Sequence, residues 1–124
     1  MVSAVPVLFD TVILIDYLNS IPQAKTAMDR YSDRAISVIT WMEVMAGSTT
    51  EDEVRLRSFL QNFRLIALES DIAERGFQVR RDRKIKLPDA IIQASAELSG
   101  RTILTRNTRD FPESMVGVII PYKI

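Results

Sequence analysis

Five short apolar runs are spread along the chain, and stretches with helical periodicity lie between most of them. No Asn-Gly or similar pair joins two of the runs, as a tight hairpin would require. Strands separated by helices in this way predict an α/β fold, a three-layer α/β/α sandwich with a central parallel sheet. The predicted strands are Val5–Phe9, beginning at or just after Pro6, and Ala35–Ile39, Phe63–Leu68, Thr102–Thr105 and Val116–Ile120.

Helices are predicted between these runs from apolar residues at helical spacing. Pro88 fits a first helical turn, where its missing N–H is not needed, and Asp89 then lies beside the free amides of that turn. Thr40 and Glu43 have the spacing of a capping box, which predicts a helix start at Thr40. Phe77 is expected to face inward. The other predicted helices are Thr11–Asn19, Gln23–Tyr31, Glu51–Asn62 and Asp71–Ile85.

Composition narrows the chemistry that is open to the chain. Its 124 residues, 47% of them hydrophobic, predict a single domain over residues 1–124 with its own core. The absence of cysteine and histidine excludes disulfides, thiolate nucleophiles, the usual zinc ligand and the usual general base. A hydrolase with this composition would need carboxylates or an ion that they hold.

Charge and hydropathy carry no sign of a membrane partner. The 16 basic and 16 acidic residues cancel, so any affinity for nucleic acid must be local. No stretch has the length of a membrane span, and the first residues lack the basic and apolar regions of a signal peptide. We therefore expect a cytoplasmic protein with no membrane association.

Four acids are expected at one edge of the predicted sheet. Asp10 follows the first strand, Glu43 follows the second by a few residues, Asp110 follows the fourth, and Asp89 opens the helix that leads into the fourth. Ligands of open parallel sheets bind beyond the carboxyl ends of the strands. Four carboxylates there would repel one another without a cation, and oxygen ligands suit Mg²⁺ or Mn²⁺. An ion held in this way suits the hydrolysis of a phosphodiester.

Two of these acids also have a purely structural interpretation. Asp89 could merely stabilise the first turn of its helix, whose dipole would keep the carboxylate ionised. Glu43 could merely complete the capping box with Thr40. Only partners elsewhere in the fold would favour a shared site.

A basic segment leads directly into Asp89. Residues 74–86 carry six basic and two acidic side chains, a local net charge of +4. Its position predicts a surface that attracts RNA phosphates, although such runs usually form a solvated helix face. The candidate RNA contacts are Arg80, Arg81, Arg83, Lys84 and Lys86.

Four motifs together resemble the PIN-domain ribonucleases, and among them the VapC toxins of bacterial toxin–antitoxin pairs. Their order and spacing cover nearly the whole chain. The motifs are Leu8-Phe9-Asp10-Thr11 with Leu14-Ile15-Asp16-Tyr17-Leu18 after it, Thr40-Trp41-Met42-Glu43 with Gly47, Asp89-Ala90-Ile91-Ile92, and Thr105-Arg106-Asn107-Thr108-Arg109-Asp110-Phe111.

The resemblance implies a magnesium-dependent endoribonuclease, usually a homodimer, that a small cognate VapB-like antitoxin holds inactive. It implies that Asp10, Glu43, Asp89 and Asp110 form the acidic catalytic and metal site. Thr11 and Asn107 would give polar support. In some relatives the last acid lies nearer the strand, at the position where this chain has Asn107, and we therefore assign the last acid to Asp110.

Two other classes of protein remain open. A receiver-like phosphoacceptor domain has a similar length, but it carries its acceptor Asp after the third strand, where this chain has Glu69-Ser70. A non-catalytic α/β binding module would use the acids as helix caps and the basic segment as surface. Phosphodonor labelling would identify the first class, and Mg²⁺ or Mn²⁺ binding would argue against the second.

Overall fold

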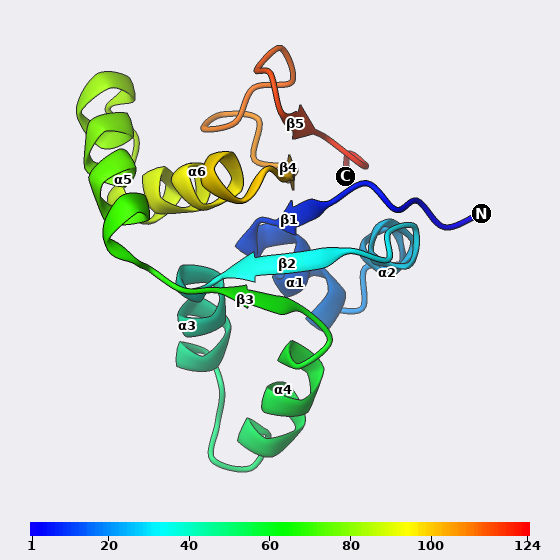
Figure 1. Ribbon diagram of the computed structural model, residues 1–124. Coiled ribbons are helices and arrows are strands. Elements are labelled where there is room, and N and C mark those ends of the chain that lie inside the picture. The colour runs from blue at the N-terminus through cyan, green and yellow to red at the C-terminus, as the bar shows by residue number, and fades with distance from the viewer.

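A five-stranded parallel sheet lies at the centre of the computed structural model, which describes residues 1–124 (Figure 1). Its strand order is β3-β2-β1-β4-β5, so the first strand is central. The predicted three-layer α/β/α sandwich is confirmed. The strands are shorter than predicted because pairing stops where the chain turns into helices and loops. They are β1 (Val7–Phe9), β2 (Arg34–Ser37), β3 (Arg64–Ile66), β4 (Thr102–Leu104) and β5 (Val118–Ile119).

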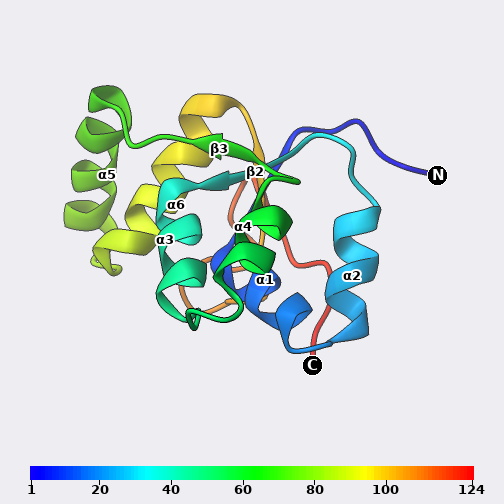
Figure 2. The ribbon, with the colours of Figure 1, turned by 90° about the horizontal axis from the view of Figure 1, so that it is seen from below.

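Six helices cover the two faces of the sheet. One face packs against α1, α2, α3 and α4 around a core that includes Phe9, Ile36 and Phe63. The other packs against α6, and α5 lies outside α6 (Figure 2). No helix is both long and apolar enough to span a membrane. The helices are α1 (Thr11–Leu18), α2 (Pro22–Asp29), α3 (Val38–Ala46), α4 (Glu53–Leu60), α5 (Ser70–Arg83) and α6 (Leu87–Ser99).

Helix α6 begins and ends as its sequence predicts. Pro88 lies in its first turn, and Gly100 ends it with φ of 68°, a left-handed conformation that glycine adopts without strain. Small side chains such as Ala90 and Ala94 are fully buried, so the helix lies close to the sheet. Gly76 of α5 faces Ile91, and an added Cβ would come within 3.4 Å of that side chain. The first turn of α6, with Asp89, is therefore fixed from both sides.

Two local predictions are wrong. Helix α3 begins at Val38, and its N-cap is Ser37, whose hydroxyl accepts a hydrogen bond from the Ile39 amide at 3.0 Å. Thr40 therefore lies within the helix, because Ser37 at the end of β2 offers an earlier cap. Phe77 is 44% exposed and lies beside Arg81, whose guanidinium is 5.3 Å from the ring centroid. Its neighbour Gly76 makes the contact with α6 instead.

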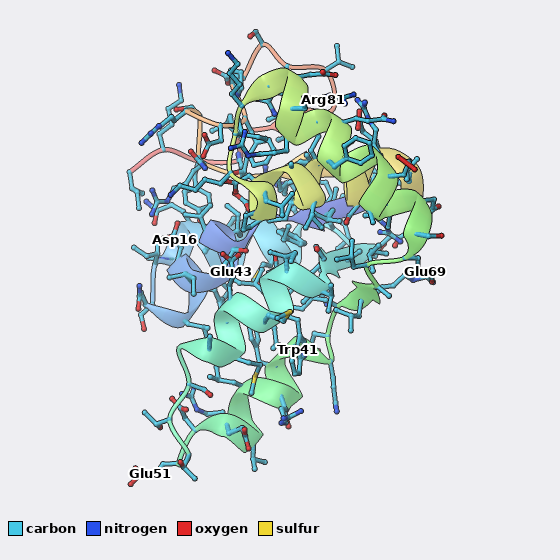
Figure 3. The ribbon with its side chains drawn as sticks, turned by 90° about the vertical axis from the view of Figure 1, so that its left-hand side faces the viewer. Asp16, Trp41, Glu43, Glu51, Glu69 and Arg81 are labelled. Atoms are coloured by element: carbon cyan, nitrogen blue, oxygen red, sulfur yellow. The ribbon has the colours of Figure 1, made fainter.

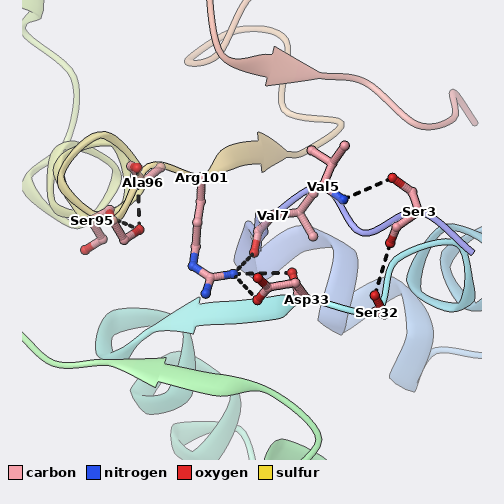
Figure 4. Close-up of polar contacts among 9 residues, drawn as sticks. Ser3, Val5, Val7, Ser32, Asp33, Ser95, Ala96 and Arg101 are labelled. Carbon is pink, nitrogen blue, oxygen red and sulfur yellow. Dashed lines mark hydrogen bonds and ion pairs between the residues drawn. The ribbon is translucent and has the colours of Figure 1, made fainter.

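The amino ends of the central strands are held together by a buried arginine (Figure 4). Arg101, just before β4, has a side chain that is only 5% exposed. Its Nη1 donates to the Val7 carbonyl at 3.2 Å and to the Asp33 carboxylate at 2.8 Å. It thus ties the starts of β4, β1 and β2 at the sheet edge opposite the four acids.

Candidate functional site

Asp10 lies at the carboxyl end of β1 and caps helix α1. Its carboxylate accepts hydrogen bonds from the Thr11 amide at 2.9 Å and from the Thr105 hydroxyl at 2.7 Å. The residue is only 4% exposed. Burial, opposed by these two bonds and reinforced by the nearby Asp89 and Glu43, raises the pKa of Asp10 to about 6. Both hydrogen-bond donors are neutral, so no cation of the protein compensates this carboxylate.

Glu43 lies on helix α3 (Figure 3), near enough to Asp10 for its charge to raise the pKa of that carboxyl. The Thr11 hydroxyl donates to Glu43 Oε1 at 2.7 Å and lies 2.8 Å from the Thr40 hydroxyl, which donates in turn. Thr11 therefore contacts one of the candidate acids, and Thr40 holds Thr11 in place. The capping interpretation of Glu43 is wrong, because this side chain bonds to α1 and not back to its own helix.

Asp89 lies in the first turn of α6 and is partly buried. Burial raises the pKa of its carboxyl first, then the charges of Asp110 and Glu43, whereas Lys86 and Arg83 lower it. The helix dipole is expected to favour the ionised form of this carboxylate, and burial and the neighbouring acids oppose that effect.

Asp110 and Asn107 lie in one turn after β4 and contact each other. The Asn107 side chain donates to Asp110 Oδ2 at 2.9 Å, and the Asn107 amide donates to the Thr105 hydroxyl at 2.9 Å. Because the carboxylate raises the pKa of Asp89, Asp110 belongs with the other three acids. Asn107 supports Asp110, so the two positions act together.

The structure thus brings all four predicted acids to the carboxyl edge of the sheet. It does not close them into a ligand shell: no three Asp or Glu side chains lie near enough to hold one metal ion. The donor chemistry still fits a hard cation, because every candidate is a carboxylate oxygen and Asp10 lacks a positive partner. A pocket of about 460 Å³ is lined by Arg106, Glu113 and Lys123 and by none of the four acids.

The basic segment is divided by the fold. Arg80, Arg81, Lys84 and Lys86 are exposed, as a nucleic-acid surface requires. Arg83 is partly buried and donates to the Gln93 side chain and to the Asp110 carbonyl, and its guanidinium lies 5.9 Å from the centre of the Phe111 ring. It therefore joins α5, α6 and the turn that carries Asp110.

Several residues of the site were not predicted. Thr105 has no signal of its own in the sequence, because it becomes a neighbour of Asp10 only through the pairing of Phe9 with Leu104 in the sheet. Asp16 is buried on α1 and forms an ion pair with Arg106. A lone acid among Ile13, Leu14 and Ile15 signals such a partner, although the sequence does not say which one.

Fold and site together define a class: an open parallel α/β/α sandwich with acids gathered where its central strands end. Within this class, the PIN domain family model matches residues 7–113. The chain belongs to the PIN domain family. A comparison with curated protein sequences finds no match.

Comparison with solved structures agrees with this assignment. A chain of a toxin–antitoxin complex from Klebsiella pneumoniae is 47% identical, with a TM-score of 0.90 over 95% of this chain and 99% of that one. FitAcB from Neisseria gonorrhoeae is 24% identical, with a TM-score of 0.79 and the same coverage. DNA-bound VapBC from Salmonella typhimurium is 22% identical, with a TM-score of 0.73 over 92% of this chain and 95% of that one. The last two show the fold alone. The predicted resemblance to PIN-domain toxins is confirmed.

Proposed function

We propose that this protein is a metal-dependent endoribonuclease that acts as the toxin of a toxin–antitoxin module. Membership of the PIN domain family supports nuclease chemistry, and the 47% identical chain from a toxin–antitoxin complex supports the toxin role. The substrate is RNA, and the cofactor is Mg²⁺ or Mn²⁺ held by Asp10, Glu43, Asp89 and Asp110.

One observation carries the proposal: Asp10 is almost fully buried, near two other acids, with only neutral hydrogen-bond donors. A protein gains no stability from this arrangement, because a buried carboxylate without a positive partner disfavours the folded state. A divalent cation between Asp10 and its acidic neighbours would remove that cost. The need for the cation explains why the acids converge.

Each residue then has a role in binding or orientation. The Thr105 hydroxyl orients Asp10, the Thr11 hydroxyl orients Glu43, and the Asn107 amide group orients Asp110. When bound, a divalent ion would lower the pKa of the attacking water and neutralise charge that develops on the scissile phosphate. The exposed Arg80, Arg81, Lys84 and Lys86 would bind neighbouring phosphates.

The partner is a small VapB-like antitoxin, and the toxin itself is a homodimer. We infer that the antitoxin inhibits by placing a cationic side chain among the acids, where an arginine can pair with two carboxylate oxygens. Such an arginine would compete with the metal. If binding of the antitoxin is unchanged by Asp89→Ala and Asp110→Ala, inhibition works by another route, such as covering the RNA surface.

The receiver-like alternative is disfavoured by topology. A phosphoacceptor after the third strand would need to lie near the central acids, but β3 is an edge strand and β2 separates it from β1. Glu69, which follows β3, lies well apart from Glu43 in Figure 3. A non-catalytic binding module would show no Mg²⁺ or Mn²⁺ binding at these acids.

Cleavage of structured RNA tests the proposal. Protein freed of its antitoxin is incubated with RNA and with Mg²⁺, Mn²⁺ or EDTA. We expect cleavage with either metal, none in EDTA, and loss of activity by orders of magnitude in Asp10→Asn, since a metal ion supplies several kcal/mol of the barrier reduction. Cleavage that persists in EDTA and survives Asp10→Asn would overturn the assignment.

A further inference from the structure

We propose that Arg106 is a positioning residue: with Asp16 and Tyr122 it forms a clamp that fixes the turn carrying Asn107 and Asp110 against helix α1. The clamp is defined as these three residues, Asp16, Arg106 and Tyr122. Its importance for catalysis rests on the proposed nuclease function. Its existence as a positioning device rests on contacts alone.

The contacts of the clamp satisfy both oxygens of one buried carboxylate. Arg106 Nε donates to Asp16 Oδ2 at 2.5 Å, and Arg106 Nη2 donates to Oδ1 at 2.8 Å. The Tyr122 hydroxyl donates to Oδ2 at 2.7 Å. The Asp16 side chain is only 5% exposed, so the carboxylate of this two-point pair is shielded from water, whereas the Arg106 side chain is 32% exposed. Asp16 is therefore fully used and is not a fifth metal ligand.

Three consecutive residues of the turn each bind a different acid. Thr105 donates to Asp10, Arg106 to Asp16 and Asn107 to Asp110. Because Asp10 caps α1 and Asp16 lies within α1, the turn is fastened to one helix at two points. The distance between Asp10 and Asp110 then depends on Arg106, which lies between the two residues that touch them.

Tyr122 brings the segment after β5 into the clamp. Its ring packs against the core formed by α1, α2 and the sheet, while its hydroxyl reaches Asp16. The guanidinium of Arg106 is thus paired with the Asp16 carboxylate, which Tyr122, far along the chain, also holds in place. Loosening the segment around Tyr122 would loosen the turn that holds Asp110.

The alternative is that the ion pair only stabilises the fold. Arg101 provides a matched control, because it also pairs with an aspartate, Asp33, through a 2.8 Å contact that has one buried member. That pair lies at the amino edge of the sheet, away from the acids. Arg101→Gln and Arg106→Gln should both lower the melting temperature, but only Arg106→Gln should disturb the site.

The experiment compares wild type, Arg106→Gln, Arg106→Lys, Tyr122→Phe and Arg101→Gln. Amide hydrogen exchange at residues 107–111 is measured well below each melting temperature, and Mn²⁺ affinity is measured by calorimetry. Residues that orient metal ligands typically change metal affinity by 10-fold or more, so we expect about 10-fold weaker binding in Arg106→Gln. We also expect about 10-fold faster exchange, because hydrogen bonds to a charged group are lost. Arg106→Lys should recover part of both losses, and Arg101→Gln should match wild type.

If Arg106→Gln fails to fold, Tyr122→Phe tests the clamp instead, because it removes one hydrogen bond to Asp16 and leaves the ion pair. We expect about threefold faster exchange in that variant. Equal exchange and equal Mn²⁺ affinity in Arg106→Gln and Arg101→Gln would overturn the clamp. A wild type that binds no Mn²⁺ would instead overturn the proposed function, and the exchange data would still decide the clamp.

Discussion

The hydroxyl of Thr105 donates to Oδ2 of Asp10 at 2.7 Å, and the two residues directly follow β4 and β1, which are paired in parallel. The sheet register alone makes them neighbours. This bond lowers the pKa of Asp10 against the larger effect of burial. Thr105 and the Thr11 amide are thus the two donors that favour the ionised form of this buried carboxyl.

Thr105→Val should raise the pKa of Asp10 further above 6, because the valine keeps the shape and removes the donor. A hydrogen bond to a charged group contributes about 1.5 to 3 kcal/mol, so Mn²⁺ affinity at pH 7 should fall. Carboxyl NMR titration of Asp10 measures the pKa directly. Thr26→Val is the control, because it removes an exposed hydroxyl on α2. If the pKa of Asp10 is unchanged in Thr105→Val, Thr105 has no role in the site.

Acidification should stabilise the metal-free protein. The folded-state pKa of Asp10, about 6, lies above the ordinary aspartate value of 3.8, so the folded state binds its proton more tightly than the unfolded state. Stability is therefore highest below about pH 4 for this group and falls as the pH rises through 6. The shift in the Asp10 pKa corresponds to a decrease of about 3 kcal/mol in the free energy of unfolding between low and high pH.

Chemical denaturation between pH 5 and 7 measures this dependence. Asp10→Asn should flatten it, because the amide does not titrate. If the free energy of unfolding of the wild type instead rises with pH across this window, as it does in Asp10→Asn, then Asp10 is not the group that destabilises the protein.

Asp89→Asn should raise the melting temperature of the metal-free protein and abolish RNA cleavage. The substitution keeps the shape and removes a charge that Asp110 and Glu43 repel. Added Mg²⁺ should stabilise the wild type more than the variant, by mass action. If Asp89→Asn and Asp10→Asn both destabilise the metal-free protein, the acids act as structural caps.

Arg81 and Arg83, both in the last turn of α5, should behave differently. Arg81 is exposed, so Arg81→Gln should weaken RNA binding and lower the slope of log K against log salt by about 0.7 to 0.9 per lost phosphate contact. Arg83 binds Gln93 and the Asp110 carbonyl, so Arg83→Gln should lower the melting temperature as well. Titration of RNA at several salt concentrations, with melting curves, separates them. If the slope of log K against log salt is the same for wild type and Arg81→Gln, Arg81 belongs to a solvated helix face and does not contact RNA.

The fold could be predicted because its signals are local. Each strand is an apolar run, and each helix has its own periodicity and end signals, such as Pro88 and Gly100 for α6. The start of α3 was missed because two residues, Ser37 and Thr40, are both competent caps. Phe77 was misplaced because α5 packs on α6 through Gly76, a contact that a hydrophobicity pattern does not record.

The sequence points to the four acids and to Thr11 and Asn107 beside them, but not to Thr105 or Arg106. Asp10 and Asp110 follow strands, and strand ends meet at one edge of a parallel sheet. Pairings such as Asp16 with Arg106 join positions 90 residues apart, and many other pairings would satisfy the same charges. The division of the basic segment depends on which arginine reaches Asp110, which only the tertiary structure decides.

Binding of Mn²⁺, followed by electron paramagnetic resonance, tests the central claim most directly. Wild type, Asp10→Asn and Glu51→Gln are titrated in the absence of RNA; Glu51 is exposed and lies well apart from Glu43 in Figure 3. We predict saturable binding by wild type and Glu51→Gln, with affinity reduced at least about 10-fold in Asp10→Asn. Equal binding by all three proteins would contradict the claim that the buried carboxylate and its acidic neighbours form a cation site.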